Sequence, residues 1–507
     1  MKLDSIALAA GARLVQGMPT LPDITGVSCD SRLVKAGDLF AALPGSKVDG
    51  AVYARQAAER GAAAILCEIE EPLTALPQLV CNDARRGLAG AARAFFGFAD
   101  RKMKMGAVTG TNGKSTTAYL VRHLMRAAGK RCGMLGTIEY DLGSDVIEAP
   151  LTTPESLDLH RYLRSMADAG CHAAFMETSS HSLCQHRVAG LDFATAVFTN
   201  LTQDHLDYHR TMDEYREAKA ILFRNLSSDA TAILNIDDPA GEFYSANTKA
   251  RVLGFSIKAP SERTTKREAE LTGWIRSMDI SGTRFQIDSP WGRRQVTWGL
   301  VGAHNVQNCL GAVAAAVSLG ASFDGVIAAL KDFRGVPGRL EPVGDGHPGL
   351  PFRILVDYAH TDDALRSVMR ALRELNPTRL ITVFGCGGDR DRTKRPKMAK
   401  AVEEMADLGI ITSDNPRTED AHAIIGDIWK GIAKEQKFLV EPDRSKAIDL
   451  AIREARAGDV VLIAGKGHEN YQIFGNEKRH FSDTEQSVAA IQRRFGPADL
   501  RGAAAGE

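Results

Sequence analysis

The chain has 507 residues, which is too long for one hydrophobic core and predicts about two to four domains. Lysine and arginine together number 63, as do aspartate and glutamate, so no net charge favours nucleic acid or a membrane surface as a partner. The longest apolar stretch, residues 310–321, is too short to span a bilayer. Eight scattered cysteines form no Cys-x-x-Cys pair, which argues against a zinc site and is typical of free thiols in a reducing cytosol.

The first hundred residues predict a small α/β unit. Its N-terminus carries Asp4 and no long apolar core, so we expect a short helix there and no signal peptide. Hydroxyls at Ser28, Ser31 and Ser46, together with Lys47, could bind a polar ligand, although each alone is more typical of a cap or a loop. Strands are expected at residues 27–32, 38–43 and 63–67, and a helix at residues 53–61.

A phosphate-binding loop is the clearest motif of the chain. The apolar run 106–108 predicts a buried strand, which is followed by Gly110-Thr-Asn-Gly-Lys-Ser115 and a helical pattern. Glycines let the backbone wrap around an anion, and the amides at the helix start face it. Lys114 would hold the β- and γ-phosphates, and the Ser115 hydroxyl would reach Mg²⁺. This is the shorter form of the motif, because Val108 stands where the longer form has its first glycine.

From about residue 104 to 338, strands and helices alternate, which predicts a mostly parallel sheet with helices on both faces. Ligands of such sheets bind beyond the carboxyl ends of the strands. Glu177 at one strand end therefore suits a carboxylate that holds the Mg²⁺ of a nucleotide, with a buried structural glutamate as the alternative. Other polar side chains expected near this edge are Asn200, Asp204, His205, Asp207 and His209.

Beyond residues 336–340 the pattern predicts a second doubly wound sheet. Three of its strands end in polar, glycine-containing loops that carry Arg390, Arg417 and Glu469. A guanidinium binds a carboxylate through two parallel hydrogen bonds, and a carboxylate binds an ammonium, so the three side chains suit a zwitterionic amino acid. Surface ion pairing is the alternative for any one of them. Strands are expected at residues 352–357, 379–384, 408–412 and 459–464.

Seven segments carry a family resemblance: residues 109–117, 177–188, 198–209, 215–219, 302–305, 356–360 and 385–391. In this order they resemble the Mur ligases, cytoplasmic ATP-dependent enzymes that build the peptide stem of peptidoglycan. The resemblance covers nearly the whole chain. Asp414-Asn-Pro-Arg417 resembles the members that add meso-2,6-diaminopimelate as the third residue of the stem, and lysine-adding members differ at this segment.

The resemblance implies an α/β protein of three domains. Residues 1–102 would form the small domain that binds the UDP-sugar, and residues 103–337 the central phosphate-loop domain with its parallel sheet. Residues 338–507 would form a Rossmann-like domain that binds the amino acid. A hinge near residues 335–338 would let the domains close for catalysis. The protein would be a cytoplasmic monomer with no nucleic acid partner.

The resemblance also implies the reaction. ATP would phosphorylate the free glutamate carboxylate of UDP-N-acetylmuramoyl-L-alanyl-D-glutamate to an acyl phosphate, which the amine of diaminopimelate would attack. Two Mg²⁺ ions would take part, and Lys219, expected on a helix surface from the residues alone, would be carbamylated. The catalytic residues would be Lys114, Glu177, His205 and Lys219, and the metal ligands Ser115, Glu177, His205 and Lys219.

Three sets of binding residues follow from the resemblance. The ATP site would comprise Gly110, Thr111, Asn112, Gly113, Lys114, Ser115, Thr116, Asn305, Arg339 and Asp357. The nucleotide-sugar peptide would meet Ser31, Ser46, Lys47, Val48, Thr152, Thr153, Ser179, Gln185 and Arg187, with Leu151 standing where the family often has an asparagine. Diaminopimelate would meet Arg390, Asp414, Asn415, Pro416, Arg417, Gly465 and Glu469.

Other functions remain open at this point. The same ligase could use L-lysine, or the chain could be a sister ligase such as a folylpolyglutamate synthase. A phosphate-loop kinase or transport ATPase, and a catalytically inactive scaffold, are the alternatives from other classes. A kinase would release a stable phosphorylated product, whereas a ligase consumes ATP only when an amine acceptor is present.

Overall fold

The computed structural model describes residues 1–15, 21–45, 48–70, 75–263, 265, 267–279 and 282–497. It divides into two compact units. The first comprises Met1–Gly273, Ile287–Arg294 and Gln307–Leu330, and the second comprises Trp274–Gln286, Gln295–Val306 and Lys331–Glu507. The predicted α/β class is confirmed, with one large sheet in each of the three expected regions and a two-stranded sheet, β23-β24, in the last of them. The domain boundaries after residues 102 and 337 remain predictions.

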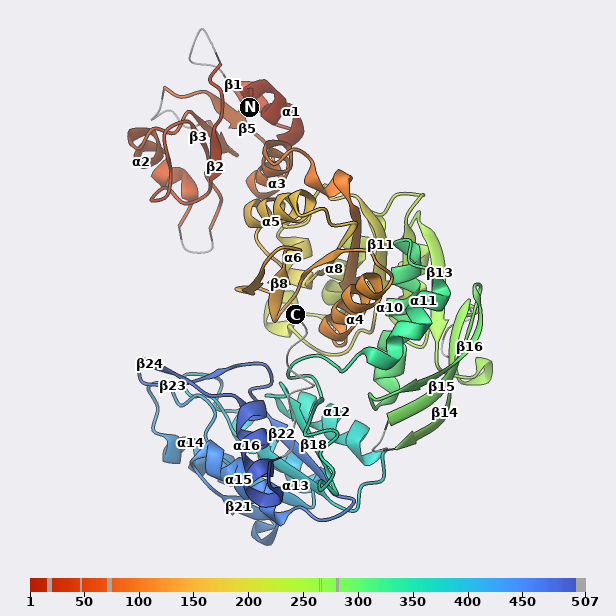
Figure 1. The fold of residues 1–507 in the computed structure, drawn as a ribbon. Coiled ribbons are helices and arrows are strands. Elements are labelled where there is room, and N and C mark those ends of the chain that lie inside the picture. The colour runs from red at the N-terminus through yellow and green to blue at the C-terminus, as the bar shows by residue number, and fades with distance from the viewer. Residues whose placement is uncertain are drawn as a thin grey trace. The chain divides into compact units, whose positions relative to one another are not determined.

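The N-terminal sheet has five strands in the order β1-β5-β4-β3-β2, all parallel except β1. Helices α1 and α3 lie side by side against it (Figure 1), because Gly90 leaves room for the carbonyl of Ala9. A Cβ on Gly90 would lie 2.2 Å from that oxygen. The elements are α1 (Leu3–Ala10), β1 (Arg13–Val15), β2 (Gly26–Ser28), β3 (Asp38–Ala41), η1 (Gly50–Tyr53), α2 (Ala54–Glu59), β4 (Ala64–Cys67), β5 (Gln78–Val80), α3 (Ala84–Phe95) and η2 (Ala99–Lys102).

Strand β2 is shorter than the predicted strand at residues 27–32. It ends at Ser28, whose hydroxyl donates to Asp30 O at 3.0 Å and accepts from the Asp30 amide at 3.2 Å. The Asp30 carboxylate in turn accepts from the Arg32 amide at 2.9 Å. Side chains that bond the neighbouring backbone compete with strand pairing, so the chain turns here.

The central sheet has eleven strands in the order β16-β15-β14-β13-β12-β11-β6-β10-β7-β8-β9. Its middle is parallel, as predicted, while β8 runs antiparallel to both β7 and β9. The strands are β6 (Lys104–Thr109), β7 (Cys132–Leu135), β8 (Glu139–Asp141), β9 (Val146–Glu148), β10 (Ala173–Glu177), β11 (Phe193–Phe198), β12 (Thr231–Asn235), β13 (Arg251–Ser256), β14 (Leu271–Asp279), β15 (Gly282–Ser289) and β16 (Gly292–Trp298).

Helices α6, α8, α9 and α11 of this region begin with a capping side chain. Thr211, for example, accepts from the Glu214 amide and so starts α8, the helix that carries Lys219. The helices are α4 (Lys114–Ala127), α5 (Ser156–Asp168), α6 (Ser180–Cys184), α7 (Leu206–His209), α8 (Met212–Arg224), α9 (Pro239–Ala246), η3 (Pro260–Glu262), α10 (Ala303–Ser318), α11 (Phe323–Ala329) and η4 (Leu330–Asp332).

The C-terminal sheet has six strands in the order β17-β18-β22-β19-β20-β21, parallel except for β17. Separate apolar cores lie on its two faces, which confirms the predicted doubly wound sheet. The elements are β17 (Glu341–Val343), β18 (Arg353–Asp357), α12 (Asp362–Arg373), β19 (Leu380–Phe384), α13 (Lys394–Met405), β20 (Leu408–Ile411), α14 (Ala421–Trp429), η5 (Glu435–Lys437), β21 (Phe438–Val440), α15 (Arg444–Glu454), β22 (Val460–Ala464), β23 (Tyr471–Phe474), β24 (Glu477–His480) and α16 (Asp483–Phe495).

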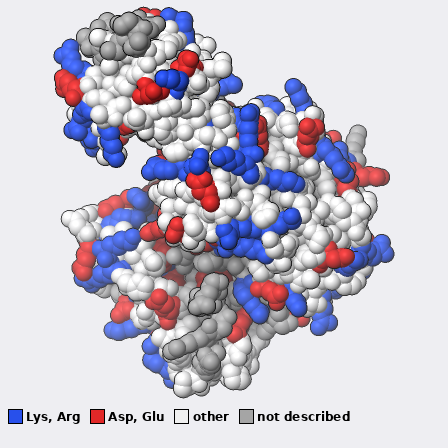
Figure 2. All heavy atoms as spheres, turned by 45° about the horizontal axis from the view of Figure 1, so that its top comes forward, with Lys and Arg blue, Asp and Glu red and all other residues white. Residues whose placement is uncertain are grey.

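Charge is mixed over the surface. Figure 2 shows basic and acidic side chains interspersed on the face it draws, in keeping with their equal numbers in the sequence. None of the helices in the described ranges is both long enough and apolar enough to cross a membrane.

A buried ion pair joins the first residues of α15 and α16. The Arg444 guanidinium meets the Asp483 carboxylate through two hydrogen bonds of 2.7 Å, and both side chains are fully buried. Arg444 also donates to Ala464 O at 3.0 Å, directly before the loop that carries Glu469. The pair therefore connects the helix layer to the carboxyl end of β22.

We expect Asp483→Ala to destabilise the protein by about 3–5 kcal/mol, because Arg444 would remain buried without a counter-charge. Urea unfolding followed by circular dichroism measures this loss. Asp23→Ala is the matched control, since its ion pair with Lys2 is more than half exposed and such pairs contribute about 1 kcal/mol or less. Equal losses in the two variants would contradict the assignment of Arg444 and Asp483 as a structural pair.

Candidate active site

The phosphate loop lies where β6 ends and α4 begins. Gly110 and Gly113 have φ angles of 152° and 84°, which favour glycine. A Cβ on Gly110 would lie 1.9 Å from Thr199 Oγ1, and one on Gly113 would lie 2.3 Å from Asn308 Oδ1. Both the backbone conformation and a close neighbour therefore require these glycines. Lys114 is the first residue of α4, so the unpaired amides of a helix start follow the loop directly.

The end of strand β11 holds this loop. Thr199 Oγ1 donates to Asn112 O at 2.6 Å, and the Asn112 amide donates to Asn200 Oδ1 at 2.9 Å. The Thr111 amide donates to Asn200 O at 2.8 Å. The carboxyl ends of β6 and β11 thus meet at one sheet edge, as parallel neighbours must.

Two lysines donate to the same loop carbonyl. Lys114 Nζ lies 3.0 Å from Gly110 O and 2.7 Å from Thr111 O, and Lys219 Nζ lies 2.9 Å from Gly110 O. Lys219 is only 1% exposed, so the helix-surface position expected from the residues alone is wrong. Helix α8 instead turns this side chain inward, beneath the loop.

Lys219 has an unusual environment for a lysine. Burial and, secondly, the nearby Lys114 charge lower the pKa of Lys219 well below its usual value. The ring of Tyr215, one helical turn earlier, lies 4.4 Å from Lys219 Nζ, and its hydroxyl lies 3.3 Å from Thr111 Oγ1. No carboxylate described in the structure forms an ion pair with Lys219. The lowered pKa favours the unprotonated amine, which is the nucleophilic form of a lysine.

Glu177 is the last residue of β10 and is 1% exposed. Its Oε1 accepts from the Thr137 amide at 2.9 Å, and its Oε2 accepts from the Thr137 hydroxyl at 3.1 Å. A Cβ on Gly136 would lie 2.5 Å from Oε1, so this turn also needs glycine. In the described ranges Glu177 makes no ion pair, and its two carboxylate oxygens accept hydrogen bonds only from Thr137.

His205 lies on the turn before α7, with φ at 53°. Its side chain is 43% exposed, and its Nε2 lies 3.4 Å from Asp204 Oδ2. The His205 ring centroid lies 6.0 Å from that of Tyr215. The side chain of Asp207, also predicted near this edge, is not among those that the structure describes. No three His, Cys, Asp or Glu side chains among the described residues could hold a metal ion together.

Four of the predicted substrate residues form one hydrogen-bonded group. Thr153 Oγ1 donates to Glu177 O at 2.9 Å and accepts from the Ser179 amide at 3.1 Å. Arg187 donates to Thr153 O at 2.9 Å and to Gln185 Oε1 at 2.7 Å. The group therefore lies beside the buried carboxylate of β10.

Two further substrate predictions lie close to this group. Thr152 accepts from the Thr137 hydroxyl at 3.2 Å, so it adjoins the same carboxylate. The Leu151 side chain is 42% exposed, and its carbonyl accepts from the Tyr140 hydroxyl.

A cavity of about 270 Å³ opens between the N-terminal sheet and α5. Ser28, Cys29 and Asp30 line one side, and Glu155, Arg161 and Gln185 the other. Of the predicted N-terminal residues, Ser31 donates to Gln56 and Val48 is half exposed. Ser46 and Lys47 lie outside the described residues.

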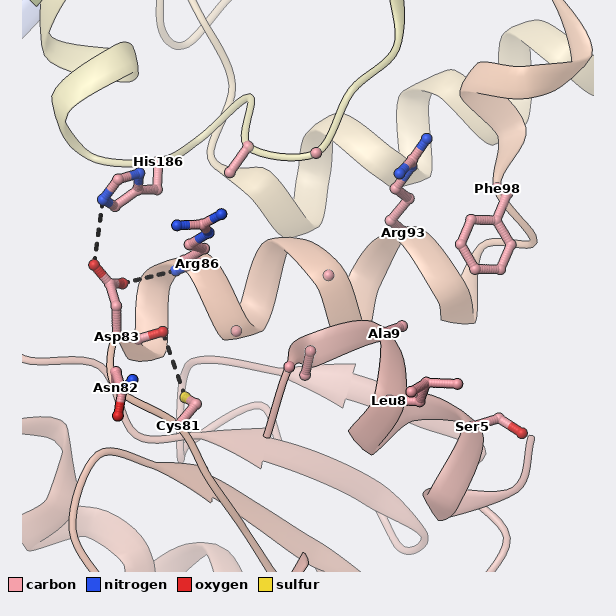
Figure 3. A pocket seen from close by; sticks show the side chains of 16 residues that line it. Ser5, Leu8, Ala9, Cys81, Asn82, Asp83, Arg86, Arg93, Phe98 and His186 are labelled. Atoms are coloured by element: carbon pink, nitrogen blue, oxygen red, sulfur yellow. Dashed lines mark hydrogen bonds and ion pairs between the residues drawn. The ribbon is translucent and has the colours of Figure 1, made fainter. Parts of the chain in front are cut away.

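A larger cavity, of about 660 Å³, lies between α1, α3 and residues 186–190 (Figure 3). His186 Nε2 lies 3.2 Å from Asp83 Oδ2 across it. Arg93 joins Asp100 and Asp192 by ion pairs of 2.6 Å and 2.7 Å. Sequence reasoning singled out none of these residues, and they connect the N-terminal sheet to the central region.

The predicted amino-acid site is centred on a residue that sequence reasoning missed. Lys466 Nζ lies 3.4 Å from Asp414 Oδ1, 3.2 Å from Asn415 Oδ1 and 3.3 Å from Glu469 Oε2. Asn415 also donates to Glu469 Oε2 at 3.0 Å. Three of the predicted ligands are therefore brought together by a buried ammonium. The Gly465-Lys-Gly467 pattern was the available signal, because a lysine between glycines at a strand end is unusual for a surface loop.

The two arginines predicted to bind diaminopimelate, Arg390 and Arg417, lie near Gly387. A Cβ there would lie 2.9 Å from Arg417 Nη1 and 3.8 Å from Arg390 Cγ. Arg417 has φ at 53° and donates to Gly388 O at 2.8 Å, whereas Arg390 is exposed. The carbonyl of buried Pro416 lies 1.8 Å from where a Gly388 Cβ would be, so this loop also depends on glycine.

The remaining nucleotide predictions lie on the second unit. Burial raises the pKa of Asp357, and the nearby Arg339 opposes this effect. Asp357 Oδ2 accepts from the Leu340 amide at 2.8 Å, and Arg339 lies 5.0 Å over the Tyr358 ring. Asn305 donates to Val301 O at 2.8 Å.

Gly465, which is predicted to bind diaminopimelate, adjoins one of these nucleotide residues. It has φ at 122° and donates its amide to Asp357 O.

Three family models match consecutive parts of the chain. The Mur ligase family, catalytic domain matches residues 23–103, the Mur ligase middle domain matches residues 108–316, and the Mur ligase, glutamate ligase domain matches residues 338–467. Together they follow the order expected from the sequence motifs.

Similar proteins include several described as UDP-N-acetylmuramoyl-L-alanyl-D-glutamate--2,6-diaminopimelate ligase. The one from Geobacillus kaustophilus is 44% identical in an alignment that covers 93% of this chain and 96% of that protein. The one from Geobacter metallireducens is 44% identical in an alignment that covers 97% of this chain and 98% of that protein.

A solved structure of a ligase with that same description is 35% identical, with a TM-score of 0.69 over 93% of this chain and 95% of the other. The folylpolyglutamate synthase of Mycobacterium tuberculosis with ADP is 18% identical, with a TM-score of 0.58 over 81% of this chain and 94% of the other. At that identity the second likeness concerns the fold alone.

We expect Gly113→Ala to weaken nucleotide binding by about 10-fold or more, because the new methyl group would displace Asn308 and distort the loop. Titration calorimetry with Mg-ATP measures the change. Gly129→Ala is the matched control, since Gly129 has a similar φ of 72° but no atom within 4 Å of an added Cβ. Equal weakening in both variants would mean that backbone strain, and not the contact with Asn308, decides the effect.

Proposed function

The chain belongs to the Mur ligase family, and from this premise we propose that it joins meso-2,6-diaminopimelate to UDP-N-acetylmuramoyl-L-alanyl-D-glutamate in peptidoglycan precursor synthesis. It is an ATP-dependent acid–amino-acid ligase. The observation that carries the acceptor assignment is the joint arrangement of Arg417, Asp414 and Glu469 at one sheet edge. One cationic and two anionic side chains there suit an acceptor whose free end is itself a zwitterion.

The reaction proceeds in two steps. A carboxylate oxygen of the glutamate attacks the γ-phosphorus of ATP, which releases ADP and forms an acyl phosphate. The neutral amine of diaminopimelate then adds to the acyl carbon, loses a proton, and expels inorganic phosphate as the amide forms. Both steps join anions or concentrate negative charge, so the chain must supply positive charge and alignment.

Lys114 supplies the first of these charges. The Lys114 ammonium lies against the carbonyls of Gly110 and Thr111. We propose that it contacts the β- and γ-phosphates when the nucleotide binds. The residues present also fit Mg²⁺, because Glu177 is a buried carboxylate without a cationic partner and Ser115 offers a hydroxyl at the start of α4. When bound, Mg²⁺ neutralises phosphate charge.

Lys219 fits a different task. A neutral amine adds to CO₂ and releases one proton, which leaves a carbamate anion on the side chain. The lowered pKa of Lys219 supports this reaction, since only the unprotonated amine is nucleophilic. With His205, such a carbamate would provide ligands for a second Mg²⁺ at the same edge.

The nucleotide-sugar substrate is assigned to the first unit. The cavity beside Ser28 has Gln185 in its wall, and Gln185 is bonded to Arg187. Through Arg187 and Thr153 this wall continues to the backbone of Glu177. The chain of contacts supports a path for the peptide from the cavity to the phosphate loop. We further propose that the enzyme works in the cytoplasm as a monomer, where ATP and nucleotide-sugars are available.

Phosphate release from ATP tests the acceptor directly. With UDP-N-acetylmuramoyl-L-alanyl-D-glutamate present, we expect release when meso-diaminopimelate is added and little when L-lysine is added. Lysine lacks the distal carboxylate, so the arginines beside Gly387 would lose their partner on binding it. Phosphate release with lysine but not with diaminopimelate would refute the proposed acceptor. Phosphate release only with a folate would indicate that the chain is a sister ligase.

Arg417→Asn sharpens this test, because asparagine tolerates the positive φ of the site. We expect the preference for diaminopimelate over lysine in kcat/KM to fall by about 10- to 100-fold, as a charge-assisted contact is lost. Arg453→Ala, an exposed arginine in the same unit, is the control. An unchanged preference in Arg417→Asn would refute the role given to this side chain.

Carbamylation of Lys219 has a spectroscopic test. In ¹³C-bicarbonate the wild type should show a carbamate resonance that Lys219→Arg lacks, while exposed Lys331→Arg keeps it. Because the pKa of Lys219 is lowered, the carbamate should be present at neutral pH and disappear as acidification protonates the amine. We expect Lys219→Arg to lower kcat by about 100-fold. Full activity without the resonance would exclude the modification.

A further inference from the structure

Lys466 lies among the acceptor ligands without being one of them. Its side chain is fully buried on the loop that follows β22. The glycines on either side, Gly465 and Gly467, have φ angles of 122° and 52°, and this backbone turns the lysine inward. We propose that Lys466 is a positioning residue that fixes the shape and net charge of the subsite for the acceptor's distal ammonium. The proposal rests on the proposed function.

The contacts of Lys466 match its chemistry. An ammonium has three N–H donors, and three oxygens lie 3.2–3.4 Å from Nζ. They belong to Asp414, Asn415 and Glu469, the side chains predicted to bind the acceptor. No other cation of the described ranges forms an ion pair with Asp414 or Glu469. One side chain therefore holds the three ligands at a fixed mutual distance.

The net charge of the subsite can be balanced by one substrate ammonium. Asp414 and Glu469 contribute two negative charges, and Lys466 contributes one positive charge, so the subsite carries one net negative charge. The distal end of meso-diaminopimelate has one ammonium and one carboxylate. A subsite with one net negative charge matches that ammonium, and Arg417, three residues after Asp414, is the proposed partner of the carboxylate.

The neighbouring hairpin of β23 and β24 also contacts Asp414 and Asn415. Asn415 Oδ1 accepts from the Ile473 amide at 3.1 Å as well as from Lys466, and Gln472 donates to Asp414 O at 2.9 Å. Strand β23 thus contacts the backbone of Asp414 and the side chain of Asn415, and Lys466 contacts the side chains of both. Without the ammonium, two carboxylates would face each other uncompensated, which costs free energy and moves them apart.

The first test is Lys466→Met, which keeps length and removes charge. We expect KM for meso-diaminopimelate to rise by about 10-fold or more, while kcat and KM for ATP change by less than about 3-fold. Lys466→Arg should recover part of the loss, because it restores the charge. A merely structural lysine would instead change all three constants together.

A charge-balanced variant separates charge from packing. Lys466→Met combined with Glu469→Gln again has one net negative charge, so its KM for diaminopimelate should lie below that of Lys466→Met alone. Ile448→Ala, a buried core change in the same sheet, controls for lost stability, and circular dichroism shows that each variant is folded. An unchanged KM in Lys466→Met, or a higher KM in the double variant, would overturn the proposal.

Failure of the proposed function would look different. If the wild type released phosphate with lysine only, the acceptor assignment would fall. The same variants measured with lysine would still decide the role of Lys466, because lysine also presents a distal ammonium. A raised KM for lysine would support the positioning role, and an unchanged KM would refute it.

Discussion

The phosphate loop is enclosed so closely that its two glycines cannot carry a side chain. Thr199 blocks one position and Asn308 the other, and both contacts come from segments far away in the sequence. The loop conformation is therefore a product of the packed central sheet and not of the six loop residues alone. Because the sheet is parallel at this point, the same edge collects Glu177, Asn200 and the buried amine of Lys219. Nucleotide chemistry depends on this one closely packed edge.

Two buried lysines show how environment decides what a side chain does. Lys219 forms no ion pair with a carboxylate in the described ranges, so burial and the nearby Lys114 charge lower its pKa, which supports the proposed carbamylation. Lys466 is equally buried but lies between two carboxylates, which compensate its charge and make it the structural centre of the proposed acceptor site. The physical difference is the presence of counter-charge within hydrogen-bonding distance.

The acceptor site also shows how strained backbone serves recognition. Arg417 adopts a positive φ, and Asp389 on the facing loop does the same. Such conformations persist only where surrounding contacts hold them, and here the Asp389 carboxylate accepts from the Thr418 hydroxyl at 2.7 Å. The hairpin β23–β24 adds backbone bonds to the same segment. Selectivity between similar amino acids needs this rigidity, because a mobile arginine would accept either of them.

The sequence by itself determined the phosphate loop, the two doubly wound sheets and the family, because local pattern and motif order carry that information. It also placed Glu177 at a strand end correctly. It did not reveal that Lys219 is buried, that β2 ends at Ser28, or that strands β14 to β16 extend the central sheet. Nor did it reveal Lys466, Arg444 or the contacts of His186. These features depend on side chains that meet only after distant segments pack together, and their burial, charge compensation and pKa values are properties of that packing.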